Sequence, residues 1–488
     1  MSSVCQPDAE WLGAFDNAKL TPRYFVTMAL LVLQEMFEFY DLFLAGYLVS
    51  ALAPSWHLTY GMSAIMLLSS GLGSMAGALL FGRWADRFGR RSLMLVGGLL
   101  FSAGCGACAL LPENAWIEFS ILRFVVGVGF AGAATVQTAL VVEITPTRHR
   151  TFLSSLMAAP VALGTFLAAL LAAHLMPVIG WRGLAATGAL PILVTLGIWL
   201  WVPESVRWLL TRNRMEDARR EAARQLGVDP ASVRLPATLP QPPAPTPFSE
   251  LLRDRGRFWW VVALWLGTSI SAYGVTLWGP TIVSQLLRIP PAEAAGYFVG
   301  LSIASFLGRI LFSVLPVRIG RRRSGEIMGY GSAVILLLAG LLNQHFVAGW
   351  SVFALLIVAG AAVYSGGFAN IAPYTVEAFP VRLGARAAGL AQSVNGLGKI
   401  VGPLFLALIA GTGDVISPKA TADAVPTAFI FLAICSAVAG LACTLFRVET
   451  HGRPLSLLAE PKQGPVPAVP DFDSQGAAQP AAASLPPT

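Results

Sequence analysis

The segment Gly-Arg-Trp-Ala-Asp-Arg-Phe-Gly-Arg-Arg at residues 82–91 lies between two long apolar stretches, and a related segment, Ser-Val-Leu-Pro-Val-Arg-Ile-Gly-Arg-Arg, occupies residues 313–322. A second match follows: Glu-Ile-Thr-Pro-Thr-Arg at residues 143–148 and Glu-Ala-Phe-Pro-Val-Arg at residues 377–382. The two offsets, 231 and 234 residues, nearly agree. Segments repeated in the same order at one spacing indicate that the chain consists of two related halves.

The composition around these segments is that of a membrane protein. Hydrophobic residues make up 55% of the 488 residues and charged residues only 12%, and the mean hydropathy is +0.67. Soluble domains carry about 25% charged residues, and these apolar stretches are long enough to cross a hydrocarbon core ~30 Å thick. We predict an all-α membrane protein whose twelve transmembrane helices form two pseudo-symmetric six-helix bundles. The predicted spans are residues 24–51, 61–82, 92–111, 114–142, 151–178, 184–202, 258–285, 293–316, 325–344, 348–376, 384–411 and 424–446.

The polar segments divide the chain further. Residues 203–257 read as a linker that contains a charged helical stretch, Arg214 to Gln225, and then a run of prolines that cannot form helix. The tail is rich in Pro, Ala, Gln and Ser, a composition typical of disorder. The predicted organisation is an N-terminal segment (1–23), a first bundle (24–202), the linker (203–257), a second bundle (258–446) and a disordered tail (447–488).

Loop charges predict the orientation. Arginines cluster after the second, fourth and eighth spans, whereas the loops around 52–60 and 342–349 contain no Lys or Arg. The positive-inside rule therefore places both termini in the cytoplasm of a cell with the protein in its inner membrane. These arginines account for the net charge of +7, so the charge requires no nucleic-acid partner.

Four motifs resemble those of the major facilitator superfamily over roughly residues 20–455. Residues 82–91 resemble the family's loop signature between helices 2 and 3, and Arg123-x-x-x-Gly127-x-Gly129 resembles its helix 4 motif. Residues 203–209 and 449–453 are similar to segments after helices 6 and 12 in the sugar-porter and organic-ion branches. Two positions depart from the pattern, since Val317 stands in place of an Asp and Val448 in place of a Pro. The resemblance implies transport by alternating access.

Helices 1 and 7 indicate the branch. Helix 7 lacks the paired glutamines that sugar porters usually carry, and its Tyr273…Trp278-x-Pro280 pattern resembles aromatic-acid and nicotinate-type proton symporters. The stretch Glu38-Phe-Tyr-Asp41 resembles their helix 1 motif of two acids. The resemblance therefore favours an organic carboxylate over a sugar as the substrate.

Three acids of the first span, Glu35, Glu38 and Asp41, are candidate proton-coupling residues. At 100° per residue they fall within a ~120° wedge, so one helix face can direct all three into the bundle. Intramembrane carboxylates mark proton or ion pathways by default. Arg123 lies at the same depth as Asp41 and is its expected partner. By resemblance, protonation of the acid breaks this pair; the alternative is a permanent bridge that orients the helices.

Lys399 is the candidate anchor for a substrate carboxylate, because a lone intramembrane Lys needs an acidic partner or an anionic ligand. The alternative is an internal ion pair with Glu38. Further candidates for substrate contacts, each as compatible with packing as with binding, are Asn395, Gln392, Gln137, Tyr273, Trp278, Asn370 and Tyr374.

The motifs at the charged ends of the helices are candidates for conformational gating. By resemblance, Asp86 meets the start of helix 11 near Gly384 when the cytoplasmic side is closed. The alternative reading is a charge belt that sets topology. The candidate gating residues are Gly82, Asp86, Arg87, Gly89, Arg90, Arg91, Glu143, Arg148, Glu204, Arg207, Glu377, Arg382, Glu449 and Arg453.

The predicted function is proton-coupled symport of a small organic solute, most simply a carboxylate, by a protein that works as a monomer. Alternatives are a sugar or polyol symporter, a drug or metabolite efflux antiporter, an uncoupled facilitator, and a sensor. We expect no enzyme activity, cofactor or metal, because the sequence has no nucleophile–base set, metal cluster or nucleotide loop. Cys105 and Cys108 form a C-x-x-C inside an apolar span, and we interpret both as small packing residues.

Overall fold

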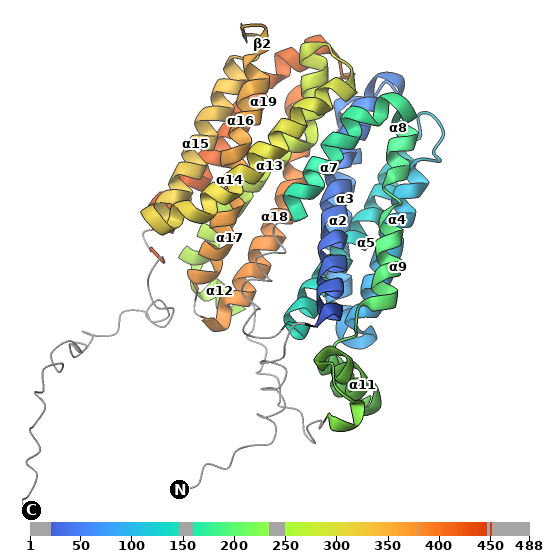
Figure 1. Ribbon diagram of the computed structural model, residues 1–488. Coiled ribbons are helices and arrows are strands. Elements are labelled where there is room, and N and C mark those ends of the chain that lie inside the picture. Colours follow the sequence, from blue (N-terminus) through green and yellow to red (C-terminus); the bar gives the residue numbers. More distant parts are fainter. Residues whose placement is uncertain (1–20, 146–159, 234–248, 380, 447–448, 451–488) are drawn as a thin grey trace, which may run out of the picture.

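A computed structural model describes residues 21–145, 160–233, 249–379, 381–446 and 449–450. Long helices run nearly parallel to one another and form two bundles side by side (Figure 1). The first bundle contains α2 (Pro22–Ser55), α3 (Tyr60–Phe88), α4 (Arg90–Cys108), α5 (Trp116–Ile144), α7 (Pro160–His174), α8 (Met176–Thr187) and α9 (Pro191–Trp201). The second contains α13 (Arg255–Leu287), α14 (Pro291–Ile319), α15 (Arg321–Leu341), α16 (Val352–Tyr364), α17 (Phe368–Glu377), α18 (Val381–Ala410) and α19 (Pro418–Leu445).

Eleven helical segments of the described residues are long and apolar enough to cross a membrane. The shorter apolar helix α7 occupies the remaining predicted span, 151–178, of which residues 151–159 lie outside the described part. The fold class predicted from the sequence is therefore confirmed. The eleven segments together with α7 are consistent with the twelve predicted spans. A two-stranded hairpin, β1 (Phe346–Val347) and β2 (Trp350–Ser351), caps the loop before α16.

The sixth span differs from its predicted bounds of 184–202. It is built from α8 and α9 and extends over Met176–Trp201. Gly180, inside α8, has a φ of 67°, a conformation that interrupts the helix near its start. Gly180 belongs to residues 179–183, the predicted loop between the fifth and sixth spans, so the interruption lies where the sequence leaves a gap between two spans.

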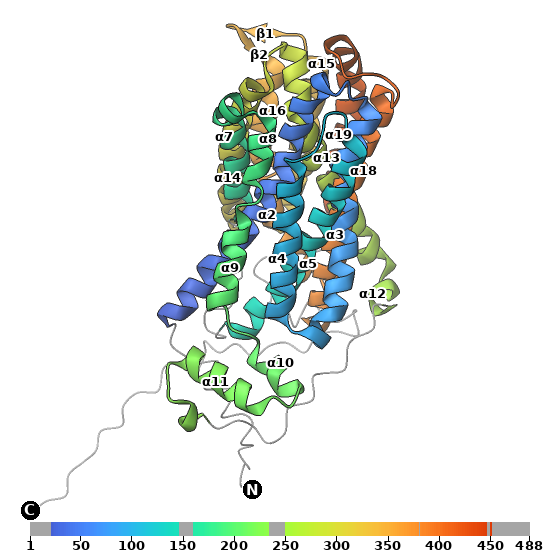
Figure 2. The ribbon, with the colours of Figure 1, turned by 90° about the vertical axis from the view of Figure 1, so that its right-hand side faces the viewer.

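The linker forms a small helical cluster beyond the end of the first bundle (Figure 2). It contains α10 (Val206–Thr211), α11 (Met215–Leu226) and a 3₁₀ turn at Pro230–Ser232, and α12 (Ser249–Arg253) precedes α13. The α11 helix lies within one residue of the stretch predicted to be helical. The Pro-rich run, residues 236–247, and the predicted disordered tail from 451 onward lie outside the described residues.

Small residues allow the helices of each bundle to approach closely. A Cβ atom at Gly77 of α3 would collide with the Val128 backbone of α5, and one at Gly127 would collide with the Ser70 backbone. In lipid, such close backbone packing supplies much of the association energy of helices. The glycines along α3 and α5 thus allow these two helices to pack backbone against backbone.

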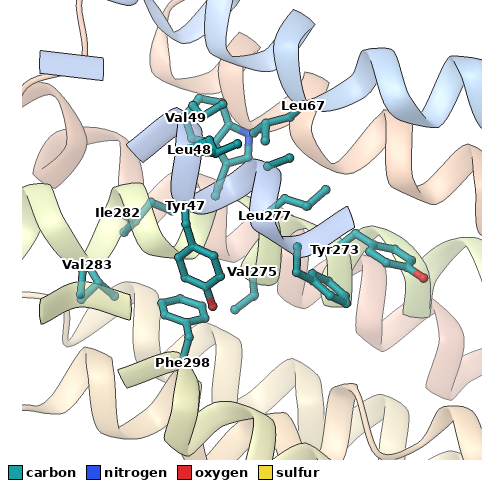
Figure 3. Packing of buried hydrophobic residues seen from close by; sticks show 14 of the residues in the cluster. Tyr47, Leu48, Val49, Leu67, Tyr273, Val275, Leu277, Ile282, Val283 and Phe298 are labelled. Carbon is teal, nitrogen blue, oxygen red and sulfur yellow. The ribbon is translucent and has the colours of Figure 1, made fainter. Parts of the chain in front are cut away.

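The two bundles meet at one end of the molecule. We call the end that carries Arg87, Arg90, Arg318 and Arg321 the charged end and the opposite one the far end. At the far end Tyr47 of α2 meets the ring of Phe298 of α14, with centroids 6.0 Å apart (Figure 3). Main-chain hydrogen bonds join Tyr60 to Asp414, Gly61 to Thr412 and Ile416 to Leu58. Toward the charged end the bundles diverge (Figure 1).

Candidate functional site

A buried ion pair joins α2 to α5. Nη1 of Arg123 donates to both carboxylate oxygens of Asp41, at 2.8 and 2.7 Å, and Nη2 donates to the Asp41 carbonyl oxygen at 3.3 Å. Asp41 is 3% exposed and Arg123 is 1% exposed. The pairing expected from the common depth of the two residues is present. Loss of either partner would leave an uncompensated charge in the interior.

The same carboxylate has a second partner that the sequence did not indicate. Sγ of Cys105 on α4 donates to Asp41 Oδ1 at 3.0 Å. Both Cys105 and Cys108 are free and buried, which agrees with their expected packing role. The contact adds a polar role for Cys105, and only the packing of α4 against α2 could reveal it.

Glu38 and Glu35 lie closer to the charged end of α2 than Asp41 does. Glu38 is 1% exposed, its Oε1 accepts from Gln34 Nε2 at 3.4 Å, and its Oε2 has no hydrogen-bond partner in the described part of the chain. Glu35 accepts from Gln137 Nε2 at 3.5 Å. Glu38 also lies within electrostatic reach of Glu35 and of Lys399. Within the described residues, these two carboxyl groups therefore have no cation as close as the one that Asp41 has.

Lys399 of α18 lies between the bundles. Its Nζ is 5.2 Å from the ring centroid of Tyr273 on α13, 5.6 Å from Phe130 on α5 and 6.0 Å from Phe39 on α2. These distances are within the range of cation–π attraction. Among the described residues no carboxylate lies within ion-pair distance of Lys399. Aromatic rings from both halves thus surround this ammonium group without neutralising it.

Polar side chains continue from Lys399 along α18. Asn395 accepts from Ser269 Oγ of α13 at 2.7 Å and donates to Gln392 Oε1 at 3.4 Å. Gln392 is exposed. Three of the predicted substrate contacts therefore follow one helix toward the charged end, and Ser269 joins them as a residue that was not predicted.

The other predicted substrate contacts divide into two groups. Tyr273 belongs to the surroundings of Lys399 and stacks on Phe43 with ring centroids 6.4 Å apart. Four lie elsewhere and have protein partners: Gln137 donates to Leu31 O, Trp278 to Pro403 O and Asn370 to Arg321 O, and Tyr374 packs edge-on against Trp260. The structure does not bring these four to Lys399. Trp278 lies against Tyr60 at the far end.

Arg309 of α14 is a cation that the sequence argument did not assign to the site. It lies on the same helix face as the buried residues Phe298, Ser302 and Ser305, which turns it away from the exposed, lipid-side face of α14. Its guanidinium lies in the neighbourhood of Tyr273. Its Nε is buried without a hydrogen-bond partner in the described part of the chain. An arginine within an apolar span is visible in the sequence. The direction in which its side chain points depends on how α14 is rotated about its own axis, which the sequence does not give.

At the charged end of the first bundle the candidate gating residues form a network. The carboxylate of Glu204 accepts from the backbone N–H groups of Arg90 and Arg91 at the start of α4 and from that of Ser205, which precedes α10. Burial raises the pKa of Glu204 above its ordinary value, and these donors partly offset the rise. The side chain of Arg90 pairs with Glu143 at 3.1 Å.

The second bundle repeats this arrangement. Glu449 accepts from the backbone N–H groups of Arg321 and Arg322 at the start of α15, and the Arg321 side chain pairs with Glu377 at 2.7 Å. Thr450 Oγ1 also donates to Glu377. Each of these contacts lies within one bundle. The sequence repeats are therefore repeats of one structural device.

The remaining candidate gating residues are only partly described. Gly82 and Arg87 lie on α3, and the Arg87 guanidinium lies over the Phe88 ring at 5.3 Å. Arg148 and Arg453 lie outside the described residues, as do the side chains of Asp86, Arg207 and Arg382. The predicted contact of Asp86 with the start of helix 11 therefore stays a prediction.

Two related helical bundles around a buried, charged mid-membrane site define the class of secondary transporters. The chain belongs to the Major Facilitator Superfamily, whose family model matches residues 31–403 and 298–478. It is therefore a membrane transport protein and not an enzyme.

Curated relatives and solved structures agree with this family. The chain is 28% identical over 382 residues to the cis,cis-muconate transport protein of Acinetobacter baylyi, covering 77% of this chain and 85% of the relative. It is 26% identical over 404 residues to the niacin transporter of the same organism (81% and 89% covered). The gentisate transporter of Corynebacterium glutamicum is 27% identical over 388 residues (77% and 78% covered). The crystal structure of a D-xylose–proton symporter matches with a TM-score of 0.68 and 19% identity, over 88% of this chain and 99% of that one, which shows the fold.

Proposed function

We propose that this protein takes up a small organic carboxylate together with protons, with Lys399 as the electrostatic anchor for the carboxylate. The observation that carries this proposal is the position of Lys399 Nζ, at 5.2 to 6.0 Å from three aromatic rings and with no described carboxylate in ion-pair distance. A cation in a mid-membrane site is costly unless an anion joins it. A substrate carboxylate supplies that anion, and the rings supply apolar walls for its carbon skeleton.

The names of the relatives support this substrate class. Muconate, niacin and gentisate, which the three relatives are named for, are all carboxylic acids with flat, unsaturated skeletons. A flat skeleton suits a site walled by Phe39, Phe130 and Tyr273, because aromatic rings stack on such groups. A sugar has neither the charge that Lys399 would neutralise nor a flat apolar face of this kind.

Proton coupling is assigned to the acids of α2. Glu38 lies within electrostatic reach of Lys399, so a charged Glu38 competes with a substrate carboxylate for the same ammonium group. A proton on Glu38 removes that competition, and substrate binding in turn favours the protonated acid by linkage. Glu35 extends the proton path toward the charged end. Asp41 is assigned the second coupling step, in which its proton uptake releases Arg123.

The proposal places the protein in the inner membrane with both termini in the cytoplasm, and an inward-facing state then accounts for the arrangement of the bundles. Hydrogen bonds join the bundles at the far end, whereas the Arg90–Glu143 and Arg321–Glu377 pairs each stay within one bundle. Rocking about the central site would separate Tyr60 from Asp414 and bring the two charged networks together. The gating residues would then hold the cytoplasmic side closed.

The test is uptake of labelled carboxylates into proteoliposomes, with and without a proton gradient directed inward. We expect the gradient to stimulate uptake, Lys399→Gln to raise the KM at least about tenfold, and Lys419→Gln, an exposed lysine of α19 at the far end, to leave the KM unchanged. The proposal fails if no carboxylate is taken up or if Lys399→Gln transports like the wild type. Carboxylate uptake that ignores the gradient would instead indicate an uncoupled facilitator.

A further inference from the structure

Arg309 has no partner that accounts for its position. It lies on the inward face of α14, ten residues from the helix end at Ile319, and so too deep to reach the surface with ease. The described residues give it no ion pair and leave its Nε without a hydrogen bond. Charged side chains in a membrane interior normally pair with another charge or line a substrate path.

The acids of the site do not supply the missing anion. Asp41 is held at 2.7 Å by Arg123 on the other side of α2. Glu38 and Glu35 interact with one another, and Glu38 with Lys399. Tyr273 lies in the neighbourhood of Arg309, and of the three rings around Lys399 it is the nearest, at 5.2 Å from Nζ. One tyrosine is therefore near two cations that have no ion-pair partner among the described residues.

We propose that the site is built for a dicarboxylate, with one carboxylate bound by Lys399 and the other by Arg309, and with the carbon skeleton against Tyr273. This inference rests on the proposed function, because Lys399 is the carboxylate anchor in both. The two cations differ in a useful way. Lys399 is a point charge that rings surround, whereas a guanidinium can bind a carboxylate through two parallel hydrogen bonds and so fix its orientation.

A site with these two cations selects substrates by the number of carboxylates they carry. A monocarboxylate satisfies Lys399 but leaves Arg309 without an anion, whereas a dicarboxylate of suitable length satisfies both cations. The skeleton between the carboxylates must be apolar and flat enough to lie along Tyr273. Small unsaturated or aromatic diacids meet these conditions.

The experiment compares matched acids in proteoliposomes that contain the full-length protein. The pairs are benzoate with terephthalate and 2,4-hexadienoate with muconate, each tested as a competitor of labelled uptake and as a labelled substrate. The variants are Arg309→Gln, Arg309→Lys and, as a matched control, Arg182→Gln, whose arginine lies over the Trp181 ring at the far end. Binding to the purified protein is measured in parallel by calorimetry.

We expect the wild type to prefer the diacid of each pair by about tenfold or more. Arg309→Gln should abolish that preference by weakening the diacid while the affinity for the monoacid stays the same. Arg309→Lys should retain part of the preference, and Arg182→Gln should behave like the wild type. If the wild type takes up both acids of each pair equally well, or if Arg309→Gln weakens both alike, the dicarboxylate proposal is wrong while carboxylate transport stands. If neither acid is transported or bound, the proposed function fails as well.

Discussion

The Asp41 carboxylate contacts both Arg123 and Cys105 in the interior of the first bundle, so this one residue joins three helices. Both partners are buried. Replacing the acid by its amide would keep the shape of the side chain and remove its charge, so the pair is well suited to a test of coupling.

We predict that Asp41→Asn lowers the free energy of unfolding in detergent by about 3–5 kcal/mol and abolishes the response of uptake to a proton gradient. The physical reason is the guanidinium of Arg123, which loses its counter-charge while still buried. The double variant Asp41→Asn, Arg123→Gln should recover much of the stability but not the coupling. Thermal unfolding and proteoliposome uptake measure the two effects.

The control is Asp217→Asn, which breaks the exposed Arg214–Asp217 pair of α11. That change should alter stability by less than about 1 kcal/mol, because exposed ion pairs contribute little. An Asp41→Asn variant that still responds to the gradient would remove Asp41 from the coupling mechanism and leave the role to Glu38.

Glu204 gives a prediction about pH. Burial raises its pKa in the folded protein above the ordinary value of 4.5, so the folded state holds the proton more tightly than the unfolded chain does. The stability contributed by this proton is complete below pH 4.5 and is lost as the pH rises through the raised pKa. The wild type should therefore lose stability relative to Glu204→Gln across that window. Melting temperatures of both proteins over a pH series would reveal it, and a constant difference would contradict it.

The Asp41–Arg123 pair could be predicted from the sequence because depth in a helix increases by 1.5 Å per residue and can be counted from a membrane surface. The Cys105 contact and the inward direction of Arg309 could not. Both depend on how a helix is rotated about its own axis, and the rotation is set by packing against several neighbours. For the same reason the sequence could not say which way Asn370, Tyr374 and Trp278 face, and their role as substrate contacts stays a prediction.

Among the elements, α4 and α15 begin in the same unusual way. Each follows a glycine with positive φ, Gly89 at 94° and Gly320 at 88°, and each has a glutamate against its first N–H groups. A Cβ atom at Gly89 would meet Glu204 Oε2 at 2.5 Å, and one at Gly320 would collide with the Glu449 carboxylate. The sequence repeat is thus explained by a helix start that needs both a glycine and an acid.

We predict that Gly89→Ala and Gly320→Ala each lower stability by about 1–3 kcal/mol and reduce uptake, because the new methyl group strains the backbone and displaces the glutamate. Gly296→Ala in α14, where an added Cβ meets nothing within 4 Å, is the control and should be neutral or slightly stabilising. The comparison requires thermal unfolding and uptake of all three variants. Equal behaviour of the three would show that the glutamates are not essential at these helix starts.

The helices themselves could be predicted well because long apolar stretches in a membrane have few alternatives to helix. The exact helix bounds were less predictable: α8 begins at Met176, before the predicted start of the sixth span at 184, although Gly180 interrupts it within the predicted loop at 179–183. The helices α10 and α11 could be foreseen only in part, since α11 has a charged, periodic sequence whereas α10 is a short apolar turn.

At the scale of the whole molecule, the hydrogen bonds between the bundles that the described residues make lie at the far end. No sequence argument could choose this state, because a protein that works by alternating access must encode both arrangements with the same residues. The structure selects one, in which residues Thr59 and Val415 face each other across an antiparallel bridge.

We predict that a disulfide between Thr59→Cys and Val415→Cys locks the protein and stops transport. The flanking hydrogen bonds make the two residues a non-hydrogen-bonded pair, whose Cα atoms lie about 4.5 Å apart, within the range of a disulfide. Oxidation should abolish uptake, and a reductant should restore it. Substrate binding in detergent should persist, because the site stays open toward the charged end. The single-cysteine variants are the controls, and uptake that survives complete cross-linking would contradict the rocking mechanism.

The far-end bridge is made of peptide groups, since Tyr60 and Gly61 donate to Asp414 and Thr412, and Ile416 donates to Leu58, through their backbones. Peptide groups are the same in every amino acid except proline. These hydrogen bonds therefore do not depend on which side chains the two loops carry, but they do depend on the number of residues in each loop. Insertions and deletions are the changes that natural variation should avoid there.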